Sequence, residues 1–279
     1  MNQLVVKKEA KLMDYLLENT EYSRNKIKSL LKYHSISISG VKLVKHDTIV
    51  KPKQVISISS EKRATKIGNI DIVYEDENYL VVNKPGGMLT ISTEKESNRT
   101  LYHFVRGYIK EQDKRNKIFI VHRLDRETSG LVVFAKNEDL KKKLQENWEK
   151  VAITRKYVAV VSGILEKKED KLIHYLKENT QNRVFISKDS SGKKAITNYK
   201  VIRENKNSLL EIEIETGRKN QIRVQLAEIG HSIIGDSKYG NVKAKKMYLH
   251  AMQLVLRDPI TGKVLSFEMD TPRDFLRQL

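Results

Sequence analysis

The chain of 279 residues contains no cysteine, only four prolines and one tryptophan, and no long hydrophobic run. The absence of cysteine excludes disulfides, thiolate metal sites and cysteine nucleophiles. The longest apolar stretches, such as Leu131–Ala135 and Tyr157–Val161, have the length of strands. A membrane helix needs roughly 20 apolar residues. We therefore expect no membrane partner and a cytoplasmic location.

Acidic residues are scarce relative to basic ones. The sequence has 53 Lys and Arg against 35 Asp and Glu, a formal net charge of +18. Such an excess indicates a polyanionic partner, because each Lys or Arg that meets a phosphate releases a condensed counterion. The charge alone leaves open the alternative that it serves only solubility.

Motifs for common cofactors are also missing. The sequence has no G-x-x-x-x-G-K-[ST] loop, no G-x-G-x-x-G and no His, Asp and Glu cluster with metal-ligand spacing. We therefore expect neither a cofactor nor a metal.

Residues 1–60 form a predicted small α/β module. Leu12, Tyr15 and Leu16 have helical spacing, and Ser23 is suited to cap a second helix. The alternation of Ser35–Ser39 predicts a strand that turns at Gly40, and Val55–Ile58 predicts the strand that closes the module. The polar segment 61–66 is predicted to be a linker to a larger domain at 67–279.

The second predicted helix of this module carries a basic stripe. Arg24, Lys28 and Lys32 recur every four residues, so they lie on one side of the helix. Residues 1–60 contain 11 Lys and Arg against 5 Asp and Glu. The stripe is either a solvated helix face or a surface that contacts RNA.

The larger domain mixes strand-like and helix-like runs. Strands are predicted at 70–74, 79–83, 130–135, 157–161, 195–201 and 209–214, and helices near 100–110, 138–150 and 220–229. This order predicts an α+β fold with a mixed, largely antiparallel sheet.

Three runs in this domain have unusual chemistry. The segment Val121–Leu131 places four charged side chains between two predicted strands, which suits either an exposed turn or a functional loop. At 215–226 a strand ends at Gly217 and a helix begins, with Arg218 and Arg223 in its first turns, where anions are favoured. In the strand after Arg155, Tyr157 and Ala159 share one face.

The run His122–Leu131 closely resembles the signature of RluA-type pseudouridine synthases. Further segments resemble that family's motifs in the right order: Asn83–Met88, Thr216–Arg218 with Gln221–Val224, Gly235–Gly240 and Leu249–Ala251. The resemblance spans about 66–279. Residues 1–60 resemble the small αL RNA-binding domain that often precedes this catalytic domain, as in a small-subunit ribosomal protein. Glu127, Asn220 and Gln225 depart from the family pattern, at positions where Asp, His and His are common.

The resemblance implies an isomerase that converts uridine in structured RNA to pseudouridine without a cofactor. It assigns the catalytic carboxylate to Asp125, its ion-pair partner to Arg223 and the aromatic side chain on the uracil to Tyr157. Asp125 could add to C1′ as a nucleophile or remove the C2′ proton as a base.

The resemblance also assigns residues to RNA binding. Arg123 matches the side chain that enters the RNA stack as the uridine flips out, an event that costs roughly a few kcal/mol. Arg218 and Gln221 are expected to bind substrate. His122 is expected to be structural, because the family's chemistry does not use it as a base.

Ribosomal RNA of the large subunit is the favoured substrate and transfer RNA the second choice, and we expect a monomer. One alternative function is a non-catalytic RNA-binding or ribosome-assembly protein, which would not need Asp125, Tyr157 and Arg223 together. Another is a glycoside hydrolase that uses Asp125 and Glu127, whose carboxyls would have to lie roughly 5–9 Å apart.

Overall fold

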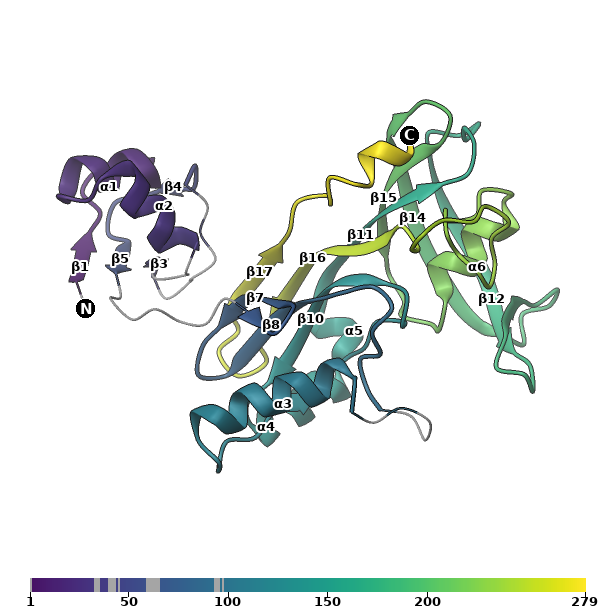
Figure 1. The fold of residues 1–279 in the computed structure, drawn as a ribbon, viewed down its shortest axis with the longest axis horizontal. Coiled ribbons are helices and arrows are strands. Elements are labelled where there is room, and N and C mark those ends of the chain that lie inside the picture. Colours follow the sequence, from purple (N-terminus) through teal and green to yellow (C-terminus); the bar gives the residue numbers. More distant parts are fainter. Residues whose placement is uncertain are drawn as a thin grey trace. The chain divides into compact units, whose positions relative to one another are not determined.

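The computed structural model describes residues 2–32, 36–39, 44, 46–58, 66–92, 96 and 98–279. The chain divides into two compact units, Met1–Asp76 and Glu77–Leu279 (Figure 1). The division falls after strands β6 (Lys66–Ile67) and β7 (Ile70–Glu75). Lys66, the last residue of the expected linker, is the first residue of β6. The other linker residues lie outside the described ones. The expected domain limits stay a prediction.

The first unit contains two helices packed on short strands. Its elements before β6 are β1 (Asn2–Val5), β2 (Ala10–Lys11), α1 (Leu12–Asn19), α2 (Arg24–Lys32), β3 (Ile36–Ile38), β4 (Ile49–Val50) and β5 (Val55–Ile58). The sheet has the order β1-β5-β3, β2 pairs with β4, and β6 pairs with β7. Ser23 caps α2 as predicted, because its Oγ accepts a hydrogen bond from Lys26 N at 3.2 Å. Ser35 and Gly40 lie outside the described residues.

The core of this unit comes from the apolar faces of the two helices. Leu12, Leu16 and Ile27 are fully buried, and Ile36 and Ile56 of the sheet pack against them. The apolar spacing in the sequence therefore predicts these two helices correctly.

The second unit is built on one large twisted sheet. Its strands are β8 (Tyr79–Lys84), β9 (Phe119–Ile120), β10 (Ser129–Ala135), β11 (Ala152–Val161), β12 (Glu169–Glu178), β13 (Val184–Ile186), β14 (Lys193–Glu204), β15 (Ser208–Ile214), β16 (Leu249–Arg257) and β17 (Val264–Glu268). They follow the order β13-β12-β14-β15-β11-β16-β10-β8, with β17 paired to β16 and β9 to β10. The pair β10–β16 is parallel and the other pairs that we describe are antiparallel. The fold class is α+β with a mixed, mostly antiparallel sheet, as predicted.

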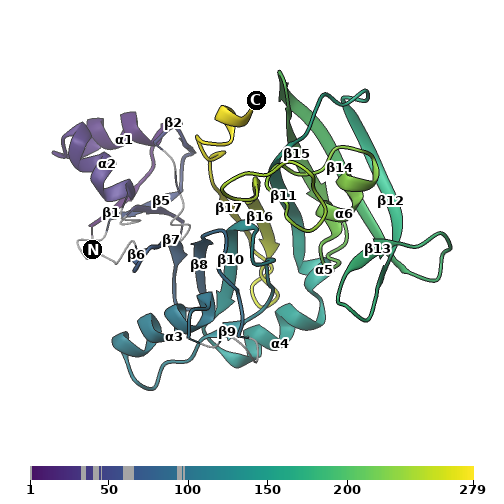
Figure 2. The ribbon, with the colours of Figure 1, turned by 45° about the vertical axis from the view of Figure 1, so that its right-hand side comes forward.

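Helices of the second unit contact both ends of this sheet. They are α3 (Leu101–Gln112), α4 (Glu138–Glu146), α5 (Trp148–Val151), α6 (Gln221–Glu228) and the 3₁₀ helix η1 (Leu276–Gln278). Helix α4 contacts β9 and β10, whereas α6 contacts β12, β13 and β14 (Figures 1 and 2). No helix among the described residues is both long and apolar enough to cross a membrane.

Strand β11 separates two parts of the core. Ala159 and Val161 pack with Ile222 and Leu226 of α6 on one face of the sheet. Val158 and Val160 pack with Phe275 on the other face. This alternation confirms the predicted strand, and it turns Tyr157 toward the same face as α6.

The parallel contact between β10 and β16 fixes the end of the charged loop at 121–129. Ser129 is opposite His250 and Gly130 is opposite Ala251. Gly130 has a φ of +118°, and a Cβ atom there would lie 2.3 Å from the carbonyl oxygen of Ala251. Only glycine fits this position.

Candidate active site

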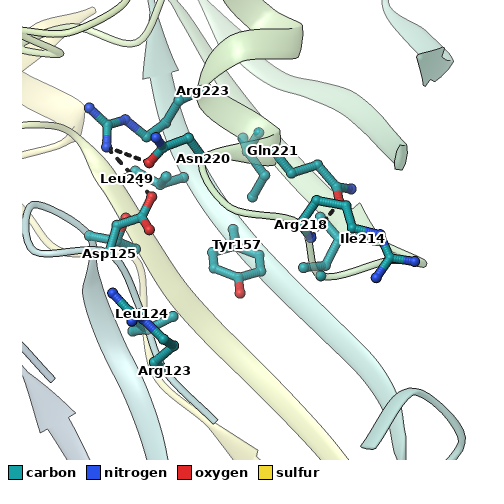
Figure 3. Close-up of a pocket in the computed structure, with 13 residues that line it drawn as sticks. Arg123, Leu124, Asp125, Tyr157, Ile214, Arg218, Asn220, Gln221, Arg223 and Leu249 are labelled. Atoms are coloured by element: carbon teal, nitrogen blue, oxygen red, sulfur yellow. Dashed lines mark hydrogen bonds and ion pairs between the residues drawn. The ribbon is translucent and has the colours of Figure 1, made fainter. Parts of the chain in front are cut away.

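A cavity of about 100 Å³ opens where the loop before β10 faces β11, β16 and the start of α6 (Figure 3). It brings together Asp125 from the loop, Tyr157 from β11 and Arg223 from α6. Arg123, Arg218 and Gln221 line it as well, so all six site residues expected in the larger domain meet in one place.

Arg223 links two carboxylates inside this cavity. Its Nε and Nη2 donate to the two carboxylate oxygens of Asp236, both at 2.7 Å, and its Nη1 lies 3.5 Å from Oδ2 of Asp125. The side chains of Asp236 and Arg223 are 0% and 7% exposed, whereas that of Asp125 is 25% exposed. Asp236 therefore fixes the guanidinium, and Asp125 is the carboxylate that stays open to a ligand.

Electrostatics keep the buried pair charged. Burial alone would lower the pKa of Arg223, but the hydrogen bonds and the charge of Asp236 outweigh it and raise that pKa. Burial would raise the pKa of Asp236, yet the hydrogen bonds and charge of Arg223 lower it below its usual range. The guanidinium that faces Asp125 is therefore a permanent positive charge.

Asn220 holds Arg223 from the other side. Its Oδ1 accepts from Arg223 Nη1 at 3.1 Å, and its Nδ2 donates to the hydroxyl of Tyr239 at 3.1 Å. Asn220 precedes α6 with a φ of +54°, a left-handed conformation that asparagine tolerates better than most residues. Asn220, in place of the family's usual histidine, thus makes a polar contact to Arg223.

Lys84, at the end of β8, anchors the loop that carries Asp125. Its fully buried Nζ donates to the carbonyl oxygens of Pro85, Met88 and Arg126 at 3.1, 2.8 and 3.0 Å. Burial lowers the pKa of Lys84 to about 7, against the opposing effect of Glu127 and Asp125. Three carbonyl acceptors match the three donors of an ammonium group.

Thr90 supports the same loop at its neighbouring residue. Its Oγ1 donates to the carbonyl of Leu124 at 2.9 Å and accepts from the amide of Leu124 at 3.3 Å. The backbone on both sides of Asp125 is therefore tied to the segment that follows β8.

Tyr157 forms the floor of the cavity between Asp125 and Arg218 (Figure 3). Its ring packs against the core between the sheet and α6. Burial raises the pKa of the phenol to about 12. Near neutral pH Tyr157 therefore presents a flat apolar ring with a protonated hydroxyl.

The three residues expected to bind substrate occupy different positions. Arg123 is exposed beside Leu124 and Asp125. Arg218 points away from Asp125 (Figure 3), with its Nη1 3.3 Å from Glu149 and its Nε donating to the carbonyl of Lys194 at 3.2 Å.

Gln221 uses its amide to hold the turn before α6. Its Oε1 accepts from Thr216 Oγ1 at 2.8 Å and from Arg218 N at 3.0 Å. Its Nε2 donates to Ile196 O and Thr197 Oγ1, both at 2.9 Å. Gln221 thus lines the cavity while its polar atoms bond to the protein.

His122 is a packed histidine, in keeping with the sequence analysis. Its Nε2 accepts from the amide of Val133 at 2.9 Å, and its ring stacks on Trp148 with centroids 4.5 Å apart. Burial lowers its pKa to about 3. Among the described residues that line the cavity, neither His122 nor Glu127 occurs, so the glycoside hydrolase alternative lacks its second carboxylate.

Gln225, another departure from the family pattern, has a structural environment. Its side chain is fully buried, its Oε1 accepts from Thr197 Oγ1 at 2.7 Å, and its Nε2 donates to the carbonyl of Leu172 at 3.2 Å. It joins α6 to the sheet rather than lining the cavity.

Asp236, Lys84 and Thr90 were not among the predicted site residues. Asp236 and Lys84 lie in two segments that resemble family motifs, Gly235–Gly240 and Asn83–Met88. The motifs marked these residues but did not reveal which residues they contact. Thr90 lies outside every motif, and nothing in the sequence marks it.

The basic stripe belongs to the first unit. Arg24 and Lys28 lie on α2 with exposed side chains. The side chain of Lys32, at the end of α2, lies outside the described residues.

Comparison with known proteins places this geometry in a family. The family model for RNA pseudouridylate synthase matches residues 78–228. The chain is 33% identical over 281 residues to ribosomal large subunit pseudouridine synthase D of Zymomonas mobilis, covering 91% of this chain and 88% of the relative. It is 30% identical over 261 residues to the uncharacterised RNA pseudouridine synthase YhcT of Bacillus subtilis, covering 90% and 86%.

A solved structure shares the fold. Human RNA pseudouridylate synthase domain containing 4 superposes with a TM-score of 0.62 and 23% identity, covering 75% of this chain and 91% of that one. The family match covers more than half of the chain and includes Asp125, Tyr157 and Arg223. The chain therefore belongs to the RNA pseudouridylate synthases, of the RluA type, and is an isomerase that acts on RNA.

Proposed function

We propose that Asp125, Arg223 and Tyr157 carry out the isomerisation of a specific uridine in the cavity of Figure 3. The observation that carries this assignment is their convergence from three separate segments on one small cavity. Asp125 is the partly exposed carboxylate of the site, and the guanidinium of Arg223 lies 3.5 Å from it.

The reaction breaks the bond between N1 and C1′ and forms a bond between C5 and C1′. The proton on C5 leaves to solvent, and N1 gains a proton. Asp125 serves either by adding to C1′, which gives a covalent ribosyl ester, or by removing the proton from C2′, which gives a glycal. Both routes need one carboxylate beside the ribose and no oxidant or reductant.

Tyr157 and Arg123 complete the proposal. The ring of Tyr157 forms a flat surface on which the detached uracil can rotate while remaining stacked. A uridine within an RNA stack must first flip out to reach a cavity of this size. The exposed Arg123 beside Asp125 is placed to occupy the vacated position in the stack.

Large-subunit ribosomal RNA is the proposed substrate. Relatives at 33% identity carry the names ribosomal large subunit pseudouridine synthase D, in Zymomonas mobilis, and C, in Rickettsia bellii. The matches cover 91% and 86% of this chain, so they extend beyond the catalytic cavity. Transfer RNA is the second candidate.

The first unit is proposed to be an αL-type RNA-binding domain. Its support is the order of two helices followed by short strands, with Arg24 and Lys28 exposed on α2. The monomeric state and the cytoplasmic location stay predictions.

Tritium release tests the substrate. Because C5 loses its hydrogen, RNA transcribed with 5-tritiated uridine releases one tritium for each pseudouridine formed. Unmodified large-subunit ribosomal RNA and a set of unmodified transfer RNAs are assayed in parallel, and the site is then mapped. Release from the ribosomal transcript is expected. Release only from transfer RNA would assign the second candidate, and release from neither would contradict the proposed substrates.

The first prediction concerns Asp125. Asp125→Asn keeps the shape of the side chain and removes the charge, so tritium release should fall by ~10³-fold or more. RNA affinity should stay within a few fold, since no contact to phosphate is lost. Asp125 would lose its assignment if this variant still formed pseudouridine at an appreciable rate.

A further inference from the structure

A second cavity adjoins the one that holds Asp125. It has a volume of about 370 Å³, and Gly217 and Arg218 line both cavities. Its other walls are β12, β13, the start of β14 and the loop before α6. The volume lies within the ~300–1,000 Å³ typical of small-ligand sites.

The floor of this second cavity is apolar. Strand pairing sets Leu176 opposite Lys193 and Glu178 opposite Val184, so these four side chains lie on one face of the sheet. Leu176 and Val184 are buried there and pack against the core under α6. Gly192 and Gly217 line the cavity with backbone atoms only.

The rim of the second cavity is basic. Lys193, Arg218 and Lys219 surround it. Lys219 pairs with Glu178 and Arg218 with Glu149, in both cases between partly exposed groups. Lys193 is exposed and has no ion-pair partner among the described residues. Partly exposed pairs are weak, so a phosphate can replace a carboxylate at this rim.

We propose that the second cavity receives the base of a nucleotide that flanks the target uridine, while Lys193 and Arg218 contact the phosphate that joins the two. The inference rests on the proposed function, because it requires the target uridine in the first cavity. Arg218 supports it, since its side chain points away from Asp125 (Figure 3) and also lines the second cavity.

The chemistry of the second cavity selects RNA over other anionic ligands. Proteins recognise single-stranded RNA by splaying unstacked bases into separate pockets. A strand with one base flipped onto Tyr157 has a neighbour that has lost its stacking partner. A cavity with buried Leu176 and Val184 on its floor and cations at its rim fits a base and its phosphate. Glu178, which lines the cavity, offers hydrogen-bond acceptors, so it favours a base that carries an amino group.

A methylphosphonate scan tests the phosphate contact. The probe is the stem–loop that contains the uridine mapped by tritium release, with one uncharged linkage at each position next to that uridine. One position should weaken binding to the wild-type protein by about tenfold, the usual value of a charge-assisted hydrogen bond. In Lys193→Ala the same substitution should weaken binding clearly less, because only Arg218 still contacts that phosphate. In Lys200→Ala, on the same strand but the opposite face, the full loss should persist.

An abasic scan of the same stem–loop tests the base contact. Loss of one flanking base should weaken wild-type binding by about tenfold. Val184→Phe, which fills the cavity, should abolish this sensitivity, and thermal unfolding checks that the variant is folded. If no position couples to Lys193, or if Lys200 couples equally, the proposal is overturned.

Failure of the proposed function would give a different result. In that case the wild-type protein releases tritium from neither RNA. The second cavity is then judged by the salt dependence of binding to unmodified large-subunit ribosomal RNA. Lys193→Glu should reduce the slope by about one more than Lys200→Glu does. Equal slopes for the two variants would overturn the inference.

Discussion

At the scale of single residues, Arg223 divides its donors unequally between two carboxylates. Asp236 takes two short hydrogen bonds of 2.7 Å, while Asp125 has one contact of 3.5 Å. The two short hydrogen bonds to Asp236 fix the guanidinium. The longer contact leaves Asp125 free to exchange Arg223 for a ligand. The proposed action of Asp125 on C1′ or C2′ needs this freedom, and the orientation of Arg223 depends on Asp236.

The second prediction follows from this division. Asp236→Asn removes one charged acceptor and loosens Arg223, so the single-turnover rate should fall by about 10–100-fold with little change in RNA affinity. The loss should therefore appear in the rate at saturating RNA and not in the dissociation constant.

Asp258→Asn is the matched control for Asp236. Asp258 is also buried, and it accepts hydrogen bonds from the hydroxyl of Tyr79 and the amides of Ile260 and Thr261, none of which lines the cavity. Asp258→Asn should alter thermal stability and leave the single-turnover rate unchanged. A wild-type single-turnover rate in Asp236→Asn would contradict the positioning role.

The resemblance to a family found the residues that touch the cavity and missed those that hold them. Asp125, Arg223 and Tyr157 lie in long motifs, so they were recognisable. Asp236 and Lys84 act through contacts between distant segments, such as Lys84 with Arg126, 42 residues away. Gln221 was expected to bind substrate because of its place in a motif. Its amide instead bonds to other residues of the protein, which the motif alone does not reveal.

At the scale of elements, His122 joins the loop of Asp125 to β10 and α5. It accepts from the amide of Val133 and stacks on Trp148. The neutral imidazole is needed for the first contact, because a protonated ring has no acceptor. Protonation would therefore break the hydrogen bond between His122 and Val133 at the start of the loop.

The third prediction is an acid-dependent loss of stability. The pKa of His122 is lowered to about 3 by burial, while an unfolded histidine has a value near 6.5. As the pH falls, the unfolded state binds the proton first, so the free energy of unfolding decreases between about pH 6.5 and pH 3, by a few kcal/mol in total.

Denaturant titrations over that pH range measure this dependence. His122→Gln keeps an acceptor and cannot titrate, so its free energy of unfolding should fall less steeply below pH 6.5. His103→Gln, on exposed helical surface, is the control and should keep the wild-type slope. Identical slopes in all three proteins would mean that His122 does not govern the acid response.

Elements with strong patterns were predicted, and mixed strands were not. Strand β11 and helices α1 and α3 have clear apolar periods. Strand β12 has ten residues of which only Leu172 and Leu176 are buried, four apart, a spacing that does not indicate a strand. Its charged side chains form cross-strand pairs such as Lys171 with Glu215, which local sequence cannot reveal.

At the scale of the whole molecule, the cavity that holds Asp125 depends on contacts between segments far apart in the sequence. The parallel pair β10–β16 brings Ser129 to His250, where Oγ and Nδ1 lie 2.9 Å apart across 121 residues. Local patterns do not specify such pairings. The resemblance to the family predicted that Asp125, Tyr157 and Arg223 meet in one site. Composition gave only the charge of +18 and the expectation of a polyanionic partner.

The fourth prediction concerns how the first unit uses part of that charge. Arg24 and Lys28 are exposed on α2, and a second RNA contact within one chain raises affinity without changing the chemistry. The double variant Arg24→Ala, Lys28→Ala should raise the dissociation constant for the natural RNA and reduce its salt slope by about 1–2. The single-turnover rate at saturating RNA should stay the same, because Asp125, Arg223 and Tyr157 belong to the other unit.

A control variant, Lys7→Ala with Lys51→Ala, removes the same charge from exposed positions of the first unit outside α2. It should change the salt slope less than the α2 variant, because only ordered contacts with phosphates release counterions in proportion to their number. Equal slopes for the two double variants would make the stripe a solvated face. A lower saturated rate with unchanged affinity would instead show that the first unit helps to build the active site, since affinity reports phosphate contacts and the saturated rate reports the geometry around Asp125.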